Sequence, residues 1–231
     1  MAAVNGMRAI AVTIAFGLAA AALFVLVPEI DLAAARLLYA EDTGFVLADT
    51  PFSVAWGKAT RTLAKAIIVL LIAGFVLTLF RKRPVLGLDG RRFLFLLLCF
   101  GIATGIVAEA VFKANWGRAR PSQITEFAGT KQFTRAFQIA DQCPTNCAFI
   151  SGDASFAFAT IAFAVLASRR RRLFVAAALG FGLAVGAMRM STGSHFLSDV
   201  VFAGVFSILT VLLLERIMLA RRRLDGPRPD G

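Results

Sequence analysis

The sequence is poor in charged residues, in histidine and in cysteine. Only 17% of its 231 residues are charged, one is histidine and three are cysteine, whereas 58% are apolar. The mean hydropathy is +0.76. Soluble domains are about 25% charged and about 45–50% apolar, so this composition excludes a soluble α/β enzyme and a disordered chain. Three cysteines are too few for a disulfide-stapled miniprotein. The composition is that of an integral membrane protein.

The charge that is present is mostly positive. There are 25 Lys and Arg residues against 14 Asp and Glu, which gives a net charge of +11. In a soluble protein this balance would suggest nucleic acid as a partner. Here the basic residues lie between apolar runs, where they mark the cytoplasmic ends of membrane spans. We therefore expect a lipid bilayer, and no nucleic acid, as the partner of this surface.

Six apolar segments predict an all-α fold, a bundle of six transmembrane helices of about 20 residues each. The segments are roughly 10–27, 64–80, 93–112, 154–167, 173–187 and 200–219, of which the fourth and fifth need flanking residues to span. The first is longer than the apolar core of a signal peptide and is interpreted as an uncleaved span. The distribution of Lys and Arg places both termini in the cytoplasm.

The segments define one transmembrane domain over residues 1–224. A short tail at 225–231, with two Pro and two Gly, is expected to be disordered. Two long loops, at about 28–63 and 113–150, fall on the outer side, where chemistry is usually located. The second contains Cys143 and Cys147. An oxidising compartment favours a disulfide between them over two free thiols.

Three outer segments carry polar residues that membrane insertion does not require. The first lies at 113–121, the second opens the fourth span at 150–155, and the third connects the fifth and sixth spans at 189–199. Their candidate site residues are Lys113, Arg120, Ser151, Gly152, Asp153, Arg189, His195 and Asp199. Each has a structural interpretation by itself, such as a snorkelling lysine or a helix cap. All of them nevertheless fall on one side of the predicted topology.

Three of these residues are cations suited to phosphate. Arginine binds phosphate oxygens through a planar fork, which applies to Arg120 and Arg189. Lys113 precedes Arg120 by seven residues, so the two share a face if the helix continues. Ser151 and Gly152 open a helix, whose free N–H groups also bind anions.

The third segment supplies a candidate nucleophile. His195 and Asp199 are four residues apart, so the carboxylate can reach the imidazole. Such a contact fixes the tautomer and stabilises the positive charge that develops on the ring. A phosphate held by three cations beside an oriented imidazole predicts phosphoryl transfer. The imidazole would attack phosphorus to form a phosphohistidine, and water would then release inorganic phosphate.

The three segments together resemble the signature of the type 2 phosphatidic acid phosphatase superfamily, which reads K-x6-R-P, P-S-G-H and S-R-x5-H-x3-D. The first part is matched in full from Lys113 to Pro121. The third is matched at every spacing, with Met188 in place of its serine. The second departs, because Ile150 replaces the proline and Asp153 replaces the histidine. The resemblance covers residues 60–220 and implies six spans.

The resemblance implies that the replaced histidine would protonate the leaving group. An aspartate is a poor acid at neutral pH, so three interpretations of Asp153 are open. It acts as the general acid in an altered environment, or the leaving group needs little protonation, or the protein is impaired as an enzyme and binds or carries phospholipids.

The resemblance extends to bacterial lipid A phosphatases, through the strings around Ser151 and His195. A good leaving group favours the anomeric 1-phosphate of lipid A as the substrate. Polyprenyl diphosphates, phosphatidylglycerophosphate and lipid phosphotransfer are the alternatives. The resemblance implies a bacterial inner membrane location with a periplasmic site. It also implies no cofactor and no metal, and the sequence, with a single histidine, lacks a ligand cluster for one. The sequence does not indicate an oligomeric state.

Overall fold

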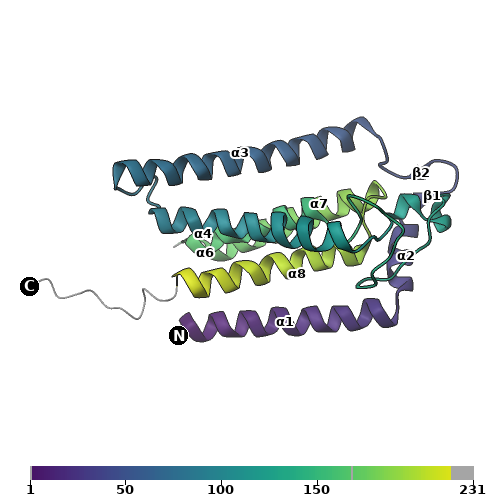
Figure 1. The fold of residues 1–231 in the computed structure, drawn as a ribbon, viewed down its shortest axis with the longest axis horizontal. Helices are drawn as coiled ribbons and strands as arrows, with labels where there is room; N and C mark the ends of the chain where they lie inside the picture. Colours follow the sequence, from purple (N-terminus) through teal and green to yellow (C-terminus); the bar gives the residue numbers. More distant parts are fainter. Residues whose placement is uncertain (1, 168, 220–231) are drawn as a thin grey trace, which may run out of the picture.

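The computed structural model describes residues 2–167 and 169–219 and is mostly helical (Figure 1). Its long helices run nearly parallel to one another. They are α1 (Ala2–Leu26), α3 (Pro51–Arg81), α4 (Gly90–Phe100) with its π-helical continuation η1 (Gly101–Lys113), α7 (Arg171–Ser191) and α8 (Leu197–Leu214) with η4 (Glu215–Leu219). The tail predicted at 225–231 lies outside the described residues.

The all-helical membrane fold is confirmed. Within the described residues, five helices are long and apolar enough to cross a membrane: Gly6–Leu26, Pro51–Arg81, Gly90–Lys113, Arg171–Ser191 and Leu197–Leu219. The fourth predicted segment is helical but short. It consists of α5 (Gly152–Ala159) and α6 (Ile161–Leu166), and at 1.5 Å per residue the stretch Gly152–Leu166 is shorter than the roughly 30 Å of a bilayer core.

Helix α8 lies at the centre of the bundle. It packs against α1, α5 and η1, while α5 also packs against α7 and η1. Phe149, Phe158 and Phe202 belong to a buried apolar cluster that joins these helices. The segments that carry the candidate site residues therefore converge on the outer end of α8.

The polar loops gather at one end of the bundle, on the right in Figure 1. They include α2 (Glu29–Arg36), the hairpin β1 (Tyr39–Ala40) and β2 (Gly44–Phe45), and the short turns η2 (Pro121–Gln123) and η3 (Thr125–Phe127). Helix α1 begins and α8 ends at the opposite end of the bundle.

The second span begins earlier than the apolar run at 64–80 predicts. Helix α3 starts at Pro51, after Thr50, whose side chain accepts a hydrogen bond from the backbone N–H of Ser53 at 3.2 Å. Threonine caps and proline in the first turn are both favoured at helix starts. These capping signals extend the helix through a polar stretch that an apolar count leaves out, so the first outer loop is shorter than 28–63.

Candidate functional site

His195 lies in the short connection between α7 and α8 and is buried. Its Nδ1 lies 2.8 Å from the carbonyl oxygen of Ala148 and 3.5 Å from Oδ2 of Asp199. Both neighbours are acceptors, so Nδ1 carries the proton and donates, and Nε2 of the neutral ring keeps its lone pair. The carboxylate that the sequence predicts as the orienting group is therefore the more distant of two partners.

The surroundings of His195 keep the ring neutral. Burial is the largest influence and lowers the pKa of His195 below its ordinary value of 6.5. Asp199 opposes this and raises the pKa, whereas the nearby charges of Arg189 and Lys113 lower it further. A neutral imidazole with a free Nε2 is the form that can act as a nucleophile.

Asp199 is buried in the first turn of α8, and both of its carboxylate oxygens are engaged. Oδ2 accepts a hydrogen bond from the backbone N–H of Phe196 at 2.8 Å and lies 3.5 Å from Nδ1 of His195. Oδ1 accepts a hydrogen bond from Nη1 of Arg118 at 2.6 Å. An aspartate in this position caps the helix, and its negative charge interacts favourably with the positive N-terminal end of the helix dipole. Asp199 is thus both a helix cap and a neighbour of the candidate nucleophile.

Arg118 and Asp31 are the residues that sequence reasoning missed. Both are fully buried, and Nη2 of Arg118 lies 2.8 Å from Oδ2 of Asp31. Asp31 comes from α2, far from the motifs in sequence, and Arg118 stands at an unspecified position between Lys113 and Arg120 in K-x6-R-P. The sequence does contain one signal for this pair. Arg118 precedes Arg120 by two residues on a segment next to the membrane, and an arginine that is buried there needs an acidic partner.

Lys113 and Arg120 meet around Asn146. Nζ of Lys113 lies 3.4 Å from Oδ1 of Asn146, and Nη2 of Arg120 donates to the carbonyl oxygen of the same residue at 2.9 Å. The prediction that the two cations share a helix face is wrong. The helix ends soon after Lys113, and the chain turns at Gly117, which has a φ of +61° and lies so close to the Ala140 carbonyl that no side chain fits. The loop, and not helical periodicity, brings the cations together.

Arg189 lies at the outer end of α7 beside Asp153. The Nε of Arg189 lies 3.5 Å from Oδ2 of Asp153, and Nη1 of Arg61 lies 4.0 Å from the same oxygen. Arg61 belongs to α3 and adds a fourth cation that no motif indicated. The Nε atom of Arg189 is buried and makes no hydrogen bond within the described residues. Its ion pair with Asp153 thus leaves the hydrogen-bonding capacity of this donor unused, and an anion that binds there could take it up.

Ser151 is the N-cap of α5, and its side chain accepts a hydrogen bond from the backbone N–H of Ala154 at 3.4 Å. Gly152 follows it where the chain passes against Glu109 and Lys113. A Cβ at Gly152 would lie 3.2 Å from Nζ of Lys113 and closer still to the Glu109 carboxylate. The start of α5 therefore lies directly beside one of the three predicted phosphate-binding cations.

Cys143 and Cys147 form a disulfide, with their Cα atoms 5.6 Å apart. The bridged segment includes Asn146, the residue that contacts both Lys113 and Arg120. The disulfide therefore restrains the loop that brings these two cations together. Cys99 is a buried free cysteine in α4.

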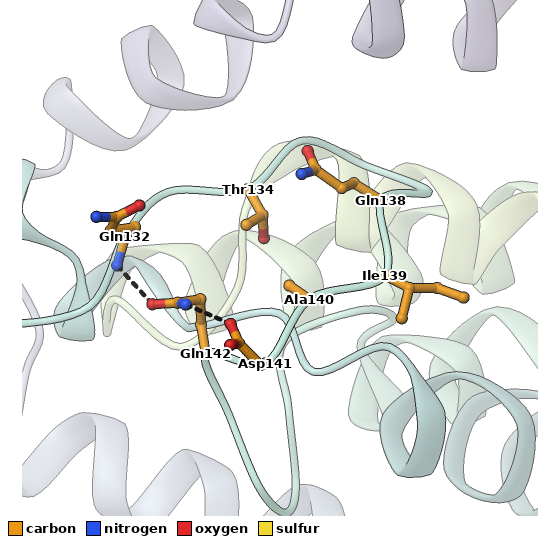
Figure 2. A pocket seen from close by; sticks show the side chains of 7 residues that line it. All are labelled: Gln132, Thr134, Gln138, Ile139, Ala140, Asp141 and Gln142. Atoms are coloured by element: carbon orange, nitrogen blue, oxygen red, sulfur yellow. Dashed lines mark hydrogen bonds between the residues drawn. The ribbon is translucent and has the colours of Figure 1, made fainter.

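Figure 2 shows a pocket in the second outer loop. It is lined by Gln132, Thr134, Gln138, Ile139, Ala140, Asp141 and Gln142. Its only charged side chain, Asp141, is acidic and accepts a hydrogen bond from Gln142 at 2.6 Å. None of the candidate site residues lines this pocket.

The chain is similar in sequence to known proteins. The chain is 42% identical to a lipid A 4'-phosphatase of Francisella tularensis subsp. novicida (strain U112) over 131 residues, which are 55% of this chain and 59% of that protein. It is 36% identical to a lipid A 4'-phosphatase of Rhizobium leguminosarum over 110 residues, or 47% of each chain. The chain thus matches about half the length of these relatives.

The fold has a solved counterpart. A transmembrane PAP2-type phosphatidylglycerolphosphate phosphatase from Bacillus subtilis superposes with a TM-score of 0.57 at 20% identity, covering 95% of this chain and 98% of that one. The sequence model of the PAP2 superfamily matches residues 94–223, which include all three motif segments. With the fold and more than half of the sequence in agreement, the chain belongs to the PAP2 superfamily.

Proposed function

We propose that this protein is a membrane-embedded lipid phosphate phosphatase that acts through a phosphohistidine on His195. The observation that carries the proposal is the state of that ring: Nδ1 donates to the carbonyl of Ala148, so Nε2 is free to attack. The positive charges of Lys113 and Arg189 act on the same ring. A neutral imidazole nucleophile under the influence of fixed cations suits attack on an anionic phosphate.

In the first step Nε2 of His195 forms a bond to phosphorus while the bond to the lipid oxygen breaks. Lys113, Arg120 and Arg189 bind the phosphate oxygens and stabilise the charge that accumulates on them. The N-terminus of α5 at Ser151 and Gly152 lies beside Lys113 and adds N–H groups. In the second step water attacks phosphorus and passes a proton to the Asp153 carboxylate, which the first step leaves ionised. The bond between phosphorus and Nε2 breaks, inorganic phosphate leaves, and the neutral imidazole is restored. These cations perform the charge neutralisation that a metal performs elsewhere, so the proposed reaction is metal-independent.

Asp153 is our candidate for the general acid. It occupies the motif position of the family's histidine, and it contacts Arg189 at 3.5 Å. In the unliganded site its carboxylate is ion-paired with Arg189 and Arg61. A substrate phosphate that binds Arg189 would replace that pair and free the Asp153 carboxyl group to act on the leaving group as a proton donor. The proton then passes to the departing lipid oxygen.

The substrate that we propose is the 4'-phosphate of lipid A. The relatives named above are lipid A 4'-phosphatases, whereas the leaving-group argument from the sequence favoured the 1-phosphate. The 4'-oxygen is an ordinary sugar hydroxyl and a poorer leaving group than an anomeric oxygen. This choice of substrate therefore requires an acid, which agrees with the role proposed for Asp153.

We propose further that the site faces the periplasm of a bacterial inner membrane. The excess of Lys and Arg on the other side supports this orientation. The disulfide between Cys143 and Cys147 lies in the same outer loop as the site, and disulfides persist in oxidising compartments.

The test is phosphate release by the detergent-purified protein in excess chelator. The substrates are lipid A with both phosphates, phosphatidylglycerophosphate, a polyprenyl diphosphate and phosphatidic acid, and mass spectrometry identifies which lipid A phosphate is lost. We expect loss of the 4'-phosphate and no release by His195→Ala. Loss of the 1-phosphate alone would refute the substrate, strict dependence on a divalent ion would refute the mechanism, and activity in His195→Ala would refute both the nucleophile and the proposal.

The role of Asp153 is tested with leaving groups. If Asp153 is the acid, Asp153→Asn slows release from an alkyl phosphate strongly and from an aryl phosphate, whose phenolate leaves without a proton, only slightly. If Asp153 only positions Arg189, both substrates slow equally. Arg83→Gln, which removes an exposed cation at the other end of α3 and α4, is the control and leaves both rates unchanged.

A further inference from the structure

A buried ionic cluster joins the first outer segment to the catalytic histidine. Arg118 is fully buried at its centre, and each of its guanidinium nitrogens has a partner. Nε donates to the carbonyl of Thr134 at 2.8 Å, Nη1 donates to Asp199 at 2.6 Å, and Nη2 donates to Asp31 at 2.8 Å. The guanidinium carbon also lies 4.3 Å from the centre of the Phe196 ring. Arg118 is thus fixed from every side.

Asp31 ties this cluster to the start of α8. Its Oδ1 accepts the backbone N–H of Ser198 at 2.8 Å, and its Oδ2 accepts the Ser198 hydroxyl at 2.6 Å as well as Nη2 of Arg118. Two carboxylates, Asp31 and Asp199, thus share one guanidinium. A planar fork is needed to reach both, and a lysine ammonium does not reproduce it.

The geometry sets the orientation of Asp199. Because Arg118 holds Oδ1, the other oxygen is turned toward the Phe196 N–H and His195. Without that contact the carboxylate could pivot about its χ2 bond, which has a broad torsional preference. Burial of three charges is costly unless the cluster is complete, so the cluster is stable only in this arrangement.

We propose that Arg118 and Asp31 are positioning residues for the catalytic dyad, with α2 supplying Asp31 to hold the Asp199 carboxylate against His195 through Arg118. The proposal rests on the proposed function for its kinetic consequences. Neither residue is a specified position of the three-part motif, although Arg118 lies within its first segment. Among the described residues, neither side chain hydrogen-bonds to the predicted phosphate-binding cations. Their loss should therefore change the state of the imidazole and the turnover number, and leave substrate binding intact.

The protein contains a single histidine, which allows a direct test. With ¹⁵N-labelled histidine and a purification tag free of histidine, NMR reports one imidazole, its tautomer and its titration in each variant. The charged groups around the ring are Asp199 from α8, Arg189 from α7 and Lys113 from η1, with Arg118 and Asp31 behind Asp199. In Asp31→Asn the positive charge of Arg118 is balanced by Asp199 alone. The imidazolium is then less favoured, and the ring should titrate at lower pH than in the wild type.

The kinetic arm uses the same variant. At metal sites, losing a partner that orients a histidine typically costs about 10- to 100-fold, and we expect kcat of Asp31→Asn to fall within that range while KM stays within about twofold. The control is Ser207→Ala, which removes a buried hydrogen bond to the Ser155 carbonyl from the same helix, α8. It should leave the titration and kcat unchanged.

An imidazole titration and a kcat equal to those of the wild type in folded Asp31→Asn would overturn the proposal. A rise in KM at constant kcat would also overturn it, because that result indicates a role in binding. If Asp31→Asn does not fold, Arg118→Lys, which keeps the charge and loses the fork, is measured in the same two ways with the same criteria. If the wild type releases no phosphate, the proposed function fails, and the NMR arm alone still decides whether this cluster controls the ring.

Discussion

Replacement of Asp199 by asparagine separates two roles of a carboxylate beside a catalytic histidine: fixing the tautomer and stabilising positive charge on the ring. In a Ser-His-Asp triad the same change costs about 10⁴-fold because the histidine adopts the wrong tautomer. Here the carbonyl of Ala148 holds the Nδ1 proton at 2.8 Å independently of Asp199, which is 3.5 Å away. The tautomer should therefore survive, and only the stabilisation of positive charge on the ring is lost. We expect kcat to fall about 10- to 100-fold, equivalent to roughly 1.4–2.8 kcal/mol at 1.4 kcal/mol per factor of ten.

In the same variant the pH dependence of kcat/KM should shift in one direction. Asp199 raises the pKa of His195, so without its charge the ring protonates at lower pH and the acid limb of kcat/KM moves down. The protein should also be less stable, because Arg118 keeps Asp31 and loses one of two anionic partners. Breaking a buried pair outright costs about 3–5 kcal/mol, and the loss should be below that range.

The assay is steady-state release of phosphate between pH 4.5 and 8, combined with thermal unfolding in detergent. A 10⁴-fold loss together with a changed tautomer would refute the role assigned to the Ala148 carbonyl. An unchanged kcat and an unchanged acid limb would refute the coupling between Asp199 and His195.

Three further predictions follow from the site. In the wild type the acid limb of kcat/KM should lie below pH 6.5, because burial lowers the pKa of His195 and activity is lost only as pH falls through that lowered value; a midpoint above 6.5 in the pH–rate profile would contradict this. Arg189→Gln should lower kcat/KM by about 10²- to 10³-fold, since it removes a donor from the developing charge, and Arg83→Gln in the same release assay should not. Cys143→Ser with Cys147→Ser should raise KM several-fold and change kcat little, because the bridged loop carries Asn146, and substrate-saturation curves with and without reductant check this.

The sequence predicts most of the site because its chemistry depends on spacing along the chain. Arg189 ends one helix, His195 lies in the short connection that follows, and Asp199 is in the first turn of the next helix. Because these elements are consecutive, the spacing of the three residues along the chain determines how they lie in space. Ser151 and Gly152 were likewise recognisable as a helix start. The helical membrane fold follows from apolar runs alone, which is the strongest signal in any sequence.

What the sequence could not predict depends on loops and on distant partners. Lys113 and Arg120 were placed on one helix face, and only the turn at Gly117 and the contact with Asn146 show how they meet. Asp31 lies far from every motif, so its pairing with Arg118 needs the packing of α2 against α8. The start of α3 at Pro51 was missed because a cap, and not hydropathy, determines it.

The central claim is that His195 becomes phosphorylated during turnover, and one measurement tests it directly. The protein is mixed with lipid A carrying a labelled 4'-phosphate, quenched in alkali within a fraction of a turnover, and digested for mass spectrometry, with Asp153→Asn examined in parallel. The account predicts label on the peptide that contains His195, stable to alkali and released by acid, and label on no other peptide. Release of labelled phosphate without any labelled peptide, in the wild type and in Asp153→Asn alike, would contradict it.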